Sequence, residues 1–209
     1  LVWGEASRRH ALEHHGFSTE EVPITGPPHF DCYHAPRKQP VESEVLVAGT
    51  SVSYWADELQ LVDFLRLRVN GLHYRPHPRR GGSWSWSAMK DLRLHLDAAI
   101  CVVAAFSTIA IEAALMGKPS LLVGFGKSAH GPAMADYHFQ LEHMAEVASW
   151  PGVQLCRSKE ELLTGLGGIL TKGLAWDATA LRHRALEVAL SDGHAQERIL
   201  EALEWTMMP

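Results

Sequence analysis

Short apolar runs alternate with amphipathic stretches along most of the chain. Short runs rich in Val, Ile and Leu are typical of buried strands. Apolar residues that recur every three or four positions are typical of helices that cover a sheet. The alternation therefore predicts βα units around a mainly parallel sheet, which is the α/β fold class.

The predicted strands are short and the predicted helices lie between them. The strands are expected at 22–25, 45–49, 72–75, 100–106, 120–125 and 153–156. The helices are expected at 6–15, 55–70, 90–98, 108–116, 133–148, 159–170, 177–190 and 195–206. The runs 100–106 and 120–125 are nearly all apolar, as expected for central strands that helices cover on both faces.

The segment 35–43 contains Pro36 and Pro40, several charged residues and no hydrophobic period, so it is the best linker candidate in the chain. We divide the chain into a leading segment (1–35), a linker (36–44) and a main body (45–209). The first residue is Leu1 rather than Met, and we expect a domain cut from a longer protein.

Composition narrows the class of protein. The chain is 46% hydrophobic and 21% charged, as in soluble globular domains, and its longest apolar run, 98–106, is too short to span a bilayer. The net charge of -5 gives no support to nucleic-acid binding. The cysteines, Cys32, Cys101 and Cys156, form no CxxC pair. We therefore expect a reducing, cytoplasmic location and no metal site built from cysteines.

The most informative segment follows the apolar run 100–106. Ser107 or Thr108 can cap the next helix, and Gly117 followed by Pro119 can end it. The free N–H groups and the positive dipole end of such a helix favour a phosphate, and the two hydroxyls can add hydrogen bonds.

Glu112 lies about one turn into this otherwise apolar helix. An ionised carboxylate in such a place needs a partner, because burying it unpaired costs several kcal/mol. The diol of a ribose or sugar would satisfy it, and so would an Arg or Lys from a neighbouring loop. The spacing does not decide between these two alternatives.

A second candidate group follows the predicted strand 72–75. Pro76 and Pro78 hold the chain extended around His77. Arg75 and His77 at the edge of a sheet would suit a diphosphate, although a His in a Pro-rich turn is often only structural. Gly49-Thr50-Ser51 follows the strand 45–49 and ends at the same carboxyl edge, where small residues let a ligand approach the backbone.

One further motif is weak. Gly124, Gly126 and Ala129 match the spacing G-x-G-x-x-A of the dinucleotide fingerprint after a strand, but no acidic strand end follows about 20 residues later. A nicotinamide or flavin role is therefore disfavoured. The Gly/Ser-rich segment 79–87 predicts a loop whose tryptophans pack it down or stack on a ligand.

Four motifs in this order resemble a known superfamily. They are VWGE at 2–5, VPITGPPHFD at 22–31, RPHP at 75–78, and ST with EAALMGKP at 107–119. They are similar to the C-terminal half of the two-domain, B-type (GT-B) glycosyltransferases. Within that superfamily they look most like the surface-carbohydrate and CDP-glycerol glycerophosphotransferase-like group. The resemblance covers 1–125.

The resemblance implies two Rossmann-like domains that face each other across a cleft, the C-terminal one holding the activated donor. It implies that His77 binds the diphosphate and helps the leaving group depart. The other implied donor-binding residues are Gly49, Thr50, Ser51 and Arg75 near the diphosphate, Ser107 and Thr108 at a phosphate, and Glu112 at the ribose or glycosyl hydroxyls. The segment 1–35 would be the tail of an N-terminal domain that carries the general base and most of the acceptor site.

The implied function is the donor-binding half of a glycosyltransferase or glycerophosphotransferase in surface polysaccharide biosynthesis, which would bind donor but catalyse little alone. No motif requires a metal, and the resemblance implies that helix dipoles and side chains stabilise the leaving diphosphate. No cofactor is expected either, and the nucleotide-diphosphate donor is a substrate. The acceptor would be a saccharide or a lipid-linked saccharide, and the latter implies peripheral contact with the inner membrane face.

Two alternatives stay open. A non-hydrolysing UDP-sugar 2-epimerase resembles the same superfamily, although Ser107-Thr108 stands where a glycine-rich turn is expected. A non-catalytic binding module derived from a transferase would need neither His77 nor Glu112.

Overall fold

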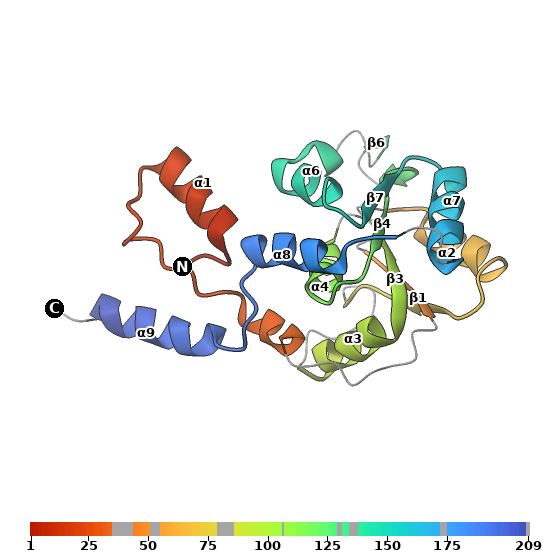
Figure 1. The fold of residues 1–209 in the computed structure, drawn as a ribbon. Helices are drawn as coiled ribbons and strands as arrows, with labels where there is room; N and C mark the ends of the chain where they lie inside the picture. The colour runs from red at the N-terminus through yellow and green to blue at the C-terminus, as the bar shows by residue number, and fades with distance from the viewer. Residues whose placement is uncertain are drawn as a thin grey trace.

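A single parallel sheet organises the molecule. The structure is a computed structural model that describes residues 1–34, 44–50, 55–78, 86–105, 107–128, 131–133, 138–171 and 175–207. The sheet has the order β2-β1-β3-β4-β7 (Figure 1). Its strands are β1 (Glu44–Ala48), β2 (Leu72–Arg75), β3 (Ala99–Ala104), β4 (Ser120–Val123) and β7 (Val153–Cys156). The predicted α/β, Rossmann-like fold is confirmed.

Alternate residues of β1 show why the sheet is covered on both faces. Val45 and Val47 pack into one apolar cluster with residues of α2 (Glu58–Arg66) and α7 (Lys159–Leu170). Leu46 and Ala48 pack into the other cluster, with α3 (Trp86–Ala98), α4 (Ile109–Leu115), α6 (Glu142–Ala148) and α8 (Ala178–Val188). Successive side chains of a strand point to opposite faces, so each strand feeds two cores.

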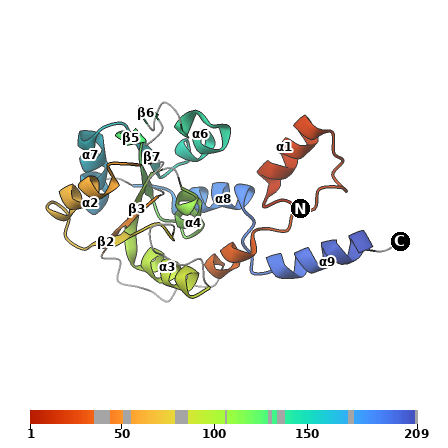
Figure 2. The same cartoon turned by 180° about the vertical axis from the view of Figure 1, so that it is seen from behind.

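The two ends of the described chain lie on the same side of the sheet. Helices α1 (Glu5–His15) and α9 (Ala195–Met207) lie beyond α8, with both termini nearby, in Figures 1 and 2. The 3₁₀ helix η1 (Pro28–Tyr33) carries Phe30 and Tyr33 into the core beside α3 and α4. The leading segment therefore packs on the body of the sheet, while the linker at 36–44 lies almost entirely outside the described residues.

The predicted strand at 22–25 is wrong. The structure has only an isolated parallel bridge between Val2 and Ile24, with one hydrogen bond from the Val2 N–H to the Pro23 carbonyl and one from the Thr25 N–H to the Val2 carbonyl. Pro23 has no N–H to extend the pairing. Gly26, at a φ of 76°, then turns the chain away.

The predicted helix at 133–148 is also wrong in its first part. The short strands β5 (Lys127–Ser128) and β6 (Gly131–Ala133) form an antiparallel pair there. Helical structure begins at η3 (His138–Gln140) and continues in α6. Elsewhere α2 is shorter than the predicted 55–70, and α3 begins at Trp86 rather than at Lys90.

Among the described residues, no helix is both long and apolar enough to cross a bilayer.

Candidate functional site

The order of the strands creates a natural ligand site at one edge of the sheet. From β1 the chain moves outward to β2 and then returns to the other side of β1 to form β3. In parallel sheets, ligands bind outside the carboxyl ends of the strands at the point where the order reverses. Gly49 and Thr50 follow β1 at this point, and Ser107 and Thr108 follow β3. The structure therefore places two of the predicted groups directly after two neighbouring strands, where the strand order reverses.

Gly49 lies where the backbones of two strand ends approach most closely. Its N–H donates to the Arg75 carbonyl at 2.8 Å. A Cβ at this position would lie too near its neighbours, 2.7 Å from Glu58 Oε1, 3.0 Å from the His77 backbone nitrogen and 3.2 Å from the Arg75 carbonyl oxygen. Glycine is required by this close approach, which brings the turn after β1 against the Arg75–His77 segment.

Glu58 organises this turn and was not among the predicted site residues. Its carboxylate is fully buried. It accepts a hydrogen bond from the Thr50 backbone N–H at 2.7 Å and another from the Tyr74 hydroxyl at 2.5 Å. One carboxylate thus joins the turn after β1 to β2. The sequence signal was an acidic residue in the first turn of α2, which is common at exposed helix ends and did not indicate burial.

Arg75 extends the cluster toward α3 and α4. Its guanidinium donates to the Ala88 carbonyl at 3.4 Å, and its positive charge favours the ionised form of Glu112. His77 is half-buried beside Gly49. The predicted residues Gly49, Thr50, Arg75 and His77 therefore lie together, whereas Ser51 lies outside the described residues.

Glu112 is buried and has a partner that the sequence did not indicate. The hydroxyl of Tyr33, which η1 carries into the core, donates a hydrogen bond to the Glu112 carboxylate. Burial raises the pKa of Glu112 to about 7, and the Tyr33 bond, the Arg75 charge and a Thr108 hydrogen bond oppose that rise. Burial and the adjacent carboxylate raise the pKa of Tyr33. A tyrosine hydroxyl thus satisfies the carboxylate, in place of the expected Arg, Lys or ligand diol.

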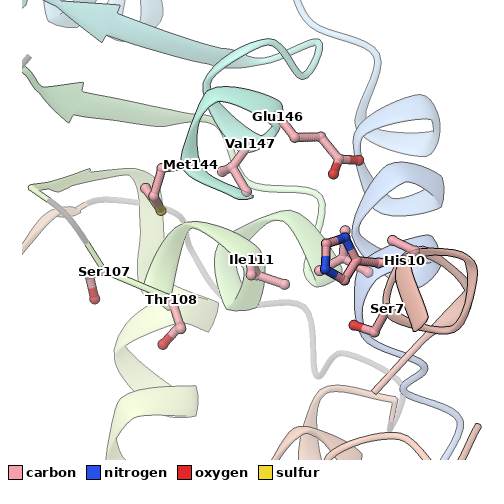
Figure 3. Close-up of a pocket in the computed structure, with 10 residues that line it drawn as sticks. Ser7, His10, Ser107, Thr108, Ile111, Met144, Glu146 and Val147 are labelled. Carbon is pink, nitrogen blue, oxygen red and sulfur yellow. The ribbon is translucent and has the colours of Figure 1, made fainter. Parts of the chain in front are cut away.

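Ser107 and Thr108 line a groove of about 440 Å³ between helices (Figure 3). A groove of this size can hold a drug-sized ligand. It lies between α4, α1, α6 and α8, and its lining residues are Ala6, Ser7, His10, Ser107, Thr108, Ile111, Met144, Glu146, Val147 and Val188. The β1 and β2 ends do not line it. The predicted residues thus form two groups that follow neighbouring strands. The strand-end cluster contains Gly49, Thr50, Arg75 and His77, and the groove cluster contains Ser107 and Thr108.

The hydroxyl of Ser107 plays the predicted local role. Its Oγ accepts a hydrogen bond from the Ile109 N–H at 3.3 Å, at the start of α4. Gly117 ends this helix at a φ of 68°, with the Lys118 N–H donating back to the Ala113 carbonyl at 2.9 Å. Such a left-handed glycine is a common helix terminator.

The structure removes the remaining support for a dinucleotide fingerprint at Gly124 and Gly126. The fingerprint requires a helix after its glycines, but here the strand β5 follows. Gly126 packs near Trp55 and Asp57, and the cavity beside it measures only about 90 Å³. This space is small for a dinucleotide.

Comparison with known proteins relates this chain to others through its fold. No family model matches, and no curated protein sequence matches. The chain is similar to S. aureus MnaA in its structure with UDP, with a TM-score of 0.51 and 14% identity over 98% of this chain and 58% of that one. It is also similar to Methanocaldococcus jannaschii UDP-GlcNAc 2-epimerase in complex with UDP-GlcNAc and UDP, with a TM-score of 0.56 and 12% identity over 97% of this chain and 59% of that one.

The chain spans about three fifths of the length of each of these proteins. At such low identities the likeness concerns the fold alone. Membership of the GT-B superfamily and of its glycerophosphotransferase-like group both stay predictions. The chain thus has a Rossmann-like α/β fold that is similar to the folds of these two UDP-bound proteins.

Proposed function

We propose that this chain binds a nucleotide-activated sugar or polyol at the carboxyl edge of its sheet. The observation that carries the proposal is the reversal of strand order between β1 and β3, with Gly49–Thr50 on one side and Ser107–Thr108 on the other. Two structures with the same fold hold UDP or UDP-GlcNAc. Both observations point to a nucleoside diphosphate conjugate as the class of ligand.

The strand-end cluster and the groove have different parts in this proposal. Arg75 and His77 supply a cation and an imidazole beside a close-packed glycine turn, which suits a diphosphate. The groove, with Ser107 and Thr108 at its edge, is large enough for a sugar or a base. Glu112 affects the site indirectly, through its charge near Arg75, because its carboxylate is buried against Tyr33.

The activity of the whole protein is proposed as a transfer reaction in which this chain is the donor-binding half. His77 would hold the diphosphate and stabilise its charge as it leaves, without a metal ion or a cofactor. The transferred group and the acceptor, a saccharide or a lipid-linked saccharide in surface polysaccharide synthesis, would meet on a second domain.

A UDP-sugar 2-epimerase is the second candidate, because both reported structural neighbours hold UDP and one of them is named as a UDP-GlcNAc 2-epimerase. The two candidates differ in one measurable respect. An epimerase interconverts UDP-sugars without any acceptor, whereas a transferase leaves the donor unchanged until an acceptor is added.

Ligand binding tests the shared part of the proposal. The chain is titrated with CDP, UDP, GDP and ADP, with their sugar or glycerol conjugates and with NAD, while the melting temperature is followed. A ligand that binds the native state raises the melting temperature, and the rise grows with the logarithm of the ratio of ligand concentration to Kd. We expect one nucleoside diphosphate family to do so, both with and without EDTA.

Matched variants locate the site. His77→Ala and Thr108→Val are expected to abolish the shift. Thr179→Val, which changes another exposed threonine near the start of a helix, is expected to retain it. A shift from NAD alone, or a shift that His77→Ala and Thr108→Val both retain, contradicts the proposal.

A further inference from the structure

A second group of side chains lies near the opposite end of the sheet. Glu44 is the first residue of β1, His73 lies early in β2, and His95 lies in the last turn of α3. Gly49 is five residues beyond Glu44 along β1, so the two ends are about 16 Å apart at ~3.3 Å per residue. This group, which we call the Glu44–His73–His95 cluster, is therefore separate from the carboxyl edge.

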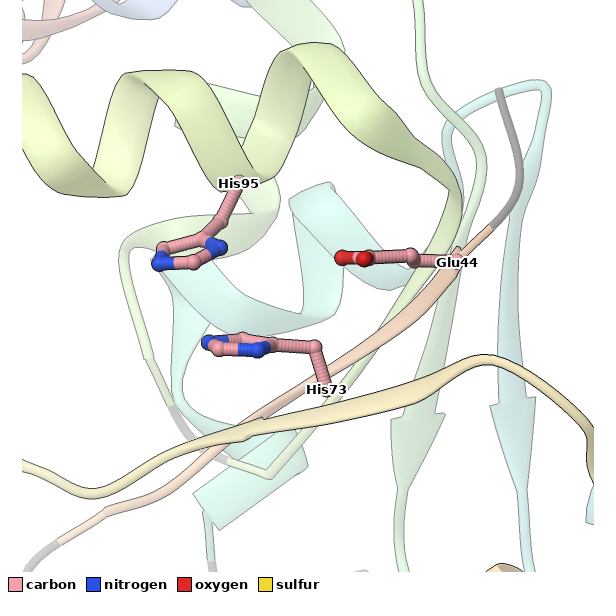
Figure 4. Close-up of side chains that lie close together, drawn as sticks. All are labelled: Glu44, His73 and His95. Atoms are coloured by element: carbon pink, nitrogen blue, oxygen red, sulfur yellow. The ribbon is translucent and has the colours of Figure 1, made fainter. Parts of the chain in front are cut away.

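The strand register explains why the three side chains meet. His73 is paired with Leu46, and Glu44 precedes Leu46 by two positions. The side chains of Glu44, Leu46 and His73 therefore point to the same face of the sheet. Leu46 packs in the core cluster that contains Leu92 and Leu96 of α3. The same helix presents His95 to His73 and Glu44 (Figure 4).

The three side chains lie near one another. The rings of His73 and His95 stack with centroids 3.7 Å apart and planes 17° from parallel. One ligand atom from each of the three side chains lies within 4.8 Å of the others. A tetrahedral zinc ion with bonds of ~2.0–2.2 Å needs donor atoms roughly 3.3 Å apart. Binding would require the two rings to tilt out of their stack so that one nitrogen of each faces the same ion, and all three residues are only partly buried.

The chemistry of the donors favours a transition metal. Two imidazoles and one carboxylate form a three-ligand set that leaves a position open for water, as in zinc sites. The neutral imidazole is the form that binds a metal. Within the described part of the chain, no hydrogen bond competes for the three side-chain ends.

We propose that Glu44, His73 and His95 bind one divalent first-row transition metal ion, with Zn²⁺ as the representative ion. The bound ion would join β1, β2 and α3 at the end of the sheet away from the nucleotide site. It would thus stabilise the fold and take no part in the proposed reaction.

The test is a Zn²⁺ titration of the whole chain after removal of metals, in competition with a chromophoric chelator. We expect one tight site per chain. His73→Gln/His95→Gln is expected to weaken it by at least tenfold, because losing even an outer partner of a zinc ligand costs roughly 10–100-fold in affinity. The control His14→Gln/His15→Gln removes two exposed histidines of α1 and should leave the affinity unchanged.

Further readouts separate a built site from weak binding to the 13 histidines of the chain. Glu44→Gln should also lower the affinity for Zn²⁺. This single variant replaces the double histidine variant in the test if the latter does not fold. Co²⁺ bound to the unmodified chain should give the intense visible absorption of a four-coordinate ion. Equal affinities in the two double variants, no tight site, or a weak six-coordinate Co²⁺ spectrum would each overturn the proposal.

Discussion

The buried carboxylate of Glu58 holds the backbone N–H of Thr50 at 2.7 Å, in the turn that follows the first strand. The same carboxylate accepts from the Tyr74 hydroxyl at 2.5 Å. The turn at the proposed diphosphate site thus has its shape set by a residue that comes from the next helix.

Glu58→Ala is expected to destabilise the protein and to weaken nucleotide binding together. The substitution removes one acceptor of the buried Thr50 N–H and of the partly buried Tyr74 hydroxyl, and losing the acceptor of a buried donor costs about 1–3 kcal/mol of unfolding free energy. Denaturant unfolding and nucleotide titration measure the two effects. Glu161→Ala is the control, because Glu161 also accepts from a backbone N–H, that of Arg157 at 2.6 Å, but is exposed. Equal losses in the two variants would argue against an organising role for Glu58.

Gly49→Ala is expected to disrupt the strand-end cluster. Its Cβ would lie 3.0 Å from the His77 backbone nitrogen and 3.2 Å from the Arg75 carbonyl oxygen, so the backbone must shift. We expect lower stability and nucleotide binding weakened by tenfold or more, on the order of 1.4 kcal/mol. Gly167→Ala in α7, whose Cβ would meet nothing within 4 Å, should instead stabilise the protein by about 0.5–1 kcal/mol. Unimpaired nucleotide binding by Gly49→Ala would place the ligand elsewhere.

Glu112→Gln is expected to flatten the pH dependence of stability. The pKa of Glu112 is raised from 4.5 to about 7 in the folded state. Its stabilising effect is therefore fully present below pH 4.5 and is lost as the pH rises through 7. That loss amounts to about 3 kcal/mol for this buried group. The difference in unfolding free energy between the wild type and Glu112→Gln, measured near pH 4.5 and above pH 7, isolates the effect. A constant difference across this range would show that Glu112 is not perturbed.

Arg198→Ala is expected to loosen the last helix from the leading segment. The guanidinium donates twice to Asp192, both times at 2.8 Å, and once to the Thr25 carbonyl at 3.0 Å. We expect faster amide hydrogen exchange in α9 and around Thr25, because these local contacts hold the helix in place. Arg66→Ala removes an exposed pair with Asp63 within one helix and should not change exchange in α9. If Arg198→Ala leaves exchange in α9 unchanged, other contacts hold the helix.

The stabilising effect of the ion pair between Arg198 and Asp192 is expected to be lost in strong acid. The hydrogen bonds from Arg198 lower the pKa of Asp192 to about 2. A depressed acidic pKa stabilises the fold above the ordinary value of 3.8 and loses that effect as the pH falls toward 2. The faster exchange of Arg198→Ala should therefore converge with that of the wild type in strong acid.

Local sequence patterns predict most of the helices and strands. They also predict which candidate site residues follow each strand. Apolar runs locate the central strands, and Gly117 with Pro119 marks the end of α4, because period and backbone preference are properties of neighbouring residues. Where a pattern is short and contains proline, as at Pro23, local reasoning fails. A single missing N–H decides whether strand pairing can continue.

By itself, the sequence determined the α/β class, the order of the main strands and helices, and which residues stand at the strand ends. Tertiary structure alone decided that β1 lies between β2 and β3, so that the strand order reverses there. It also decided that Tyr33 meets Glu112 and that His73 stacks on His95. These contacts join residues far apart in the chain. Their existence depends on how strands pair and helices cross, which no local period encodes.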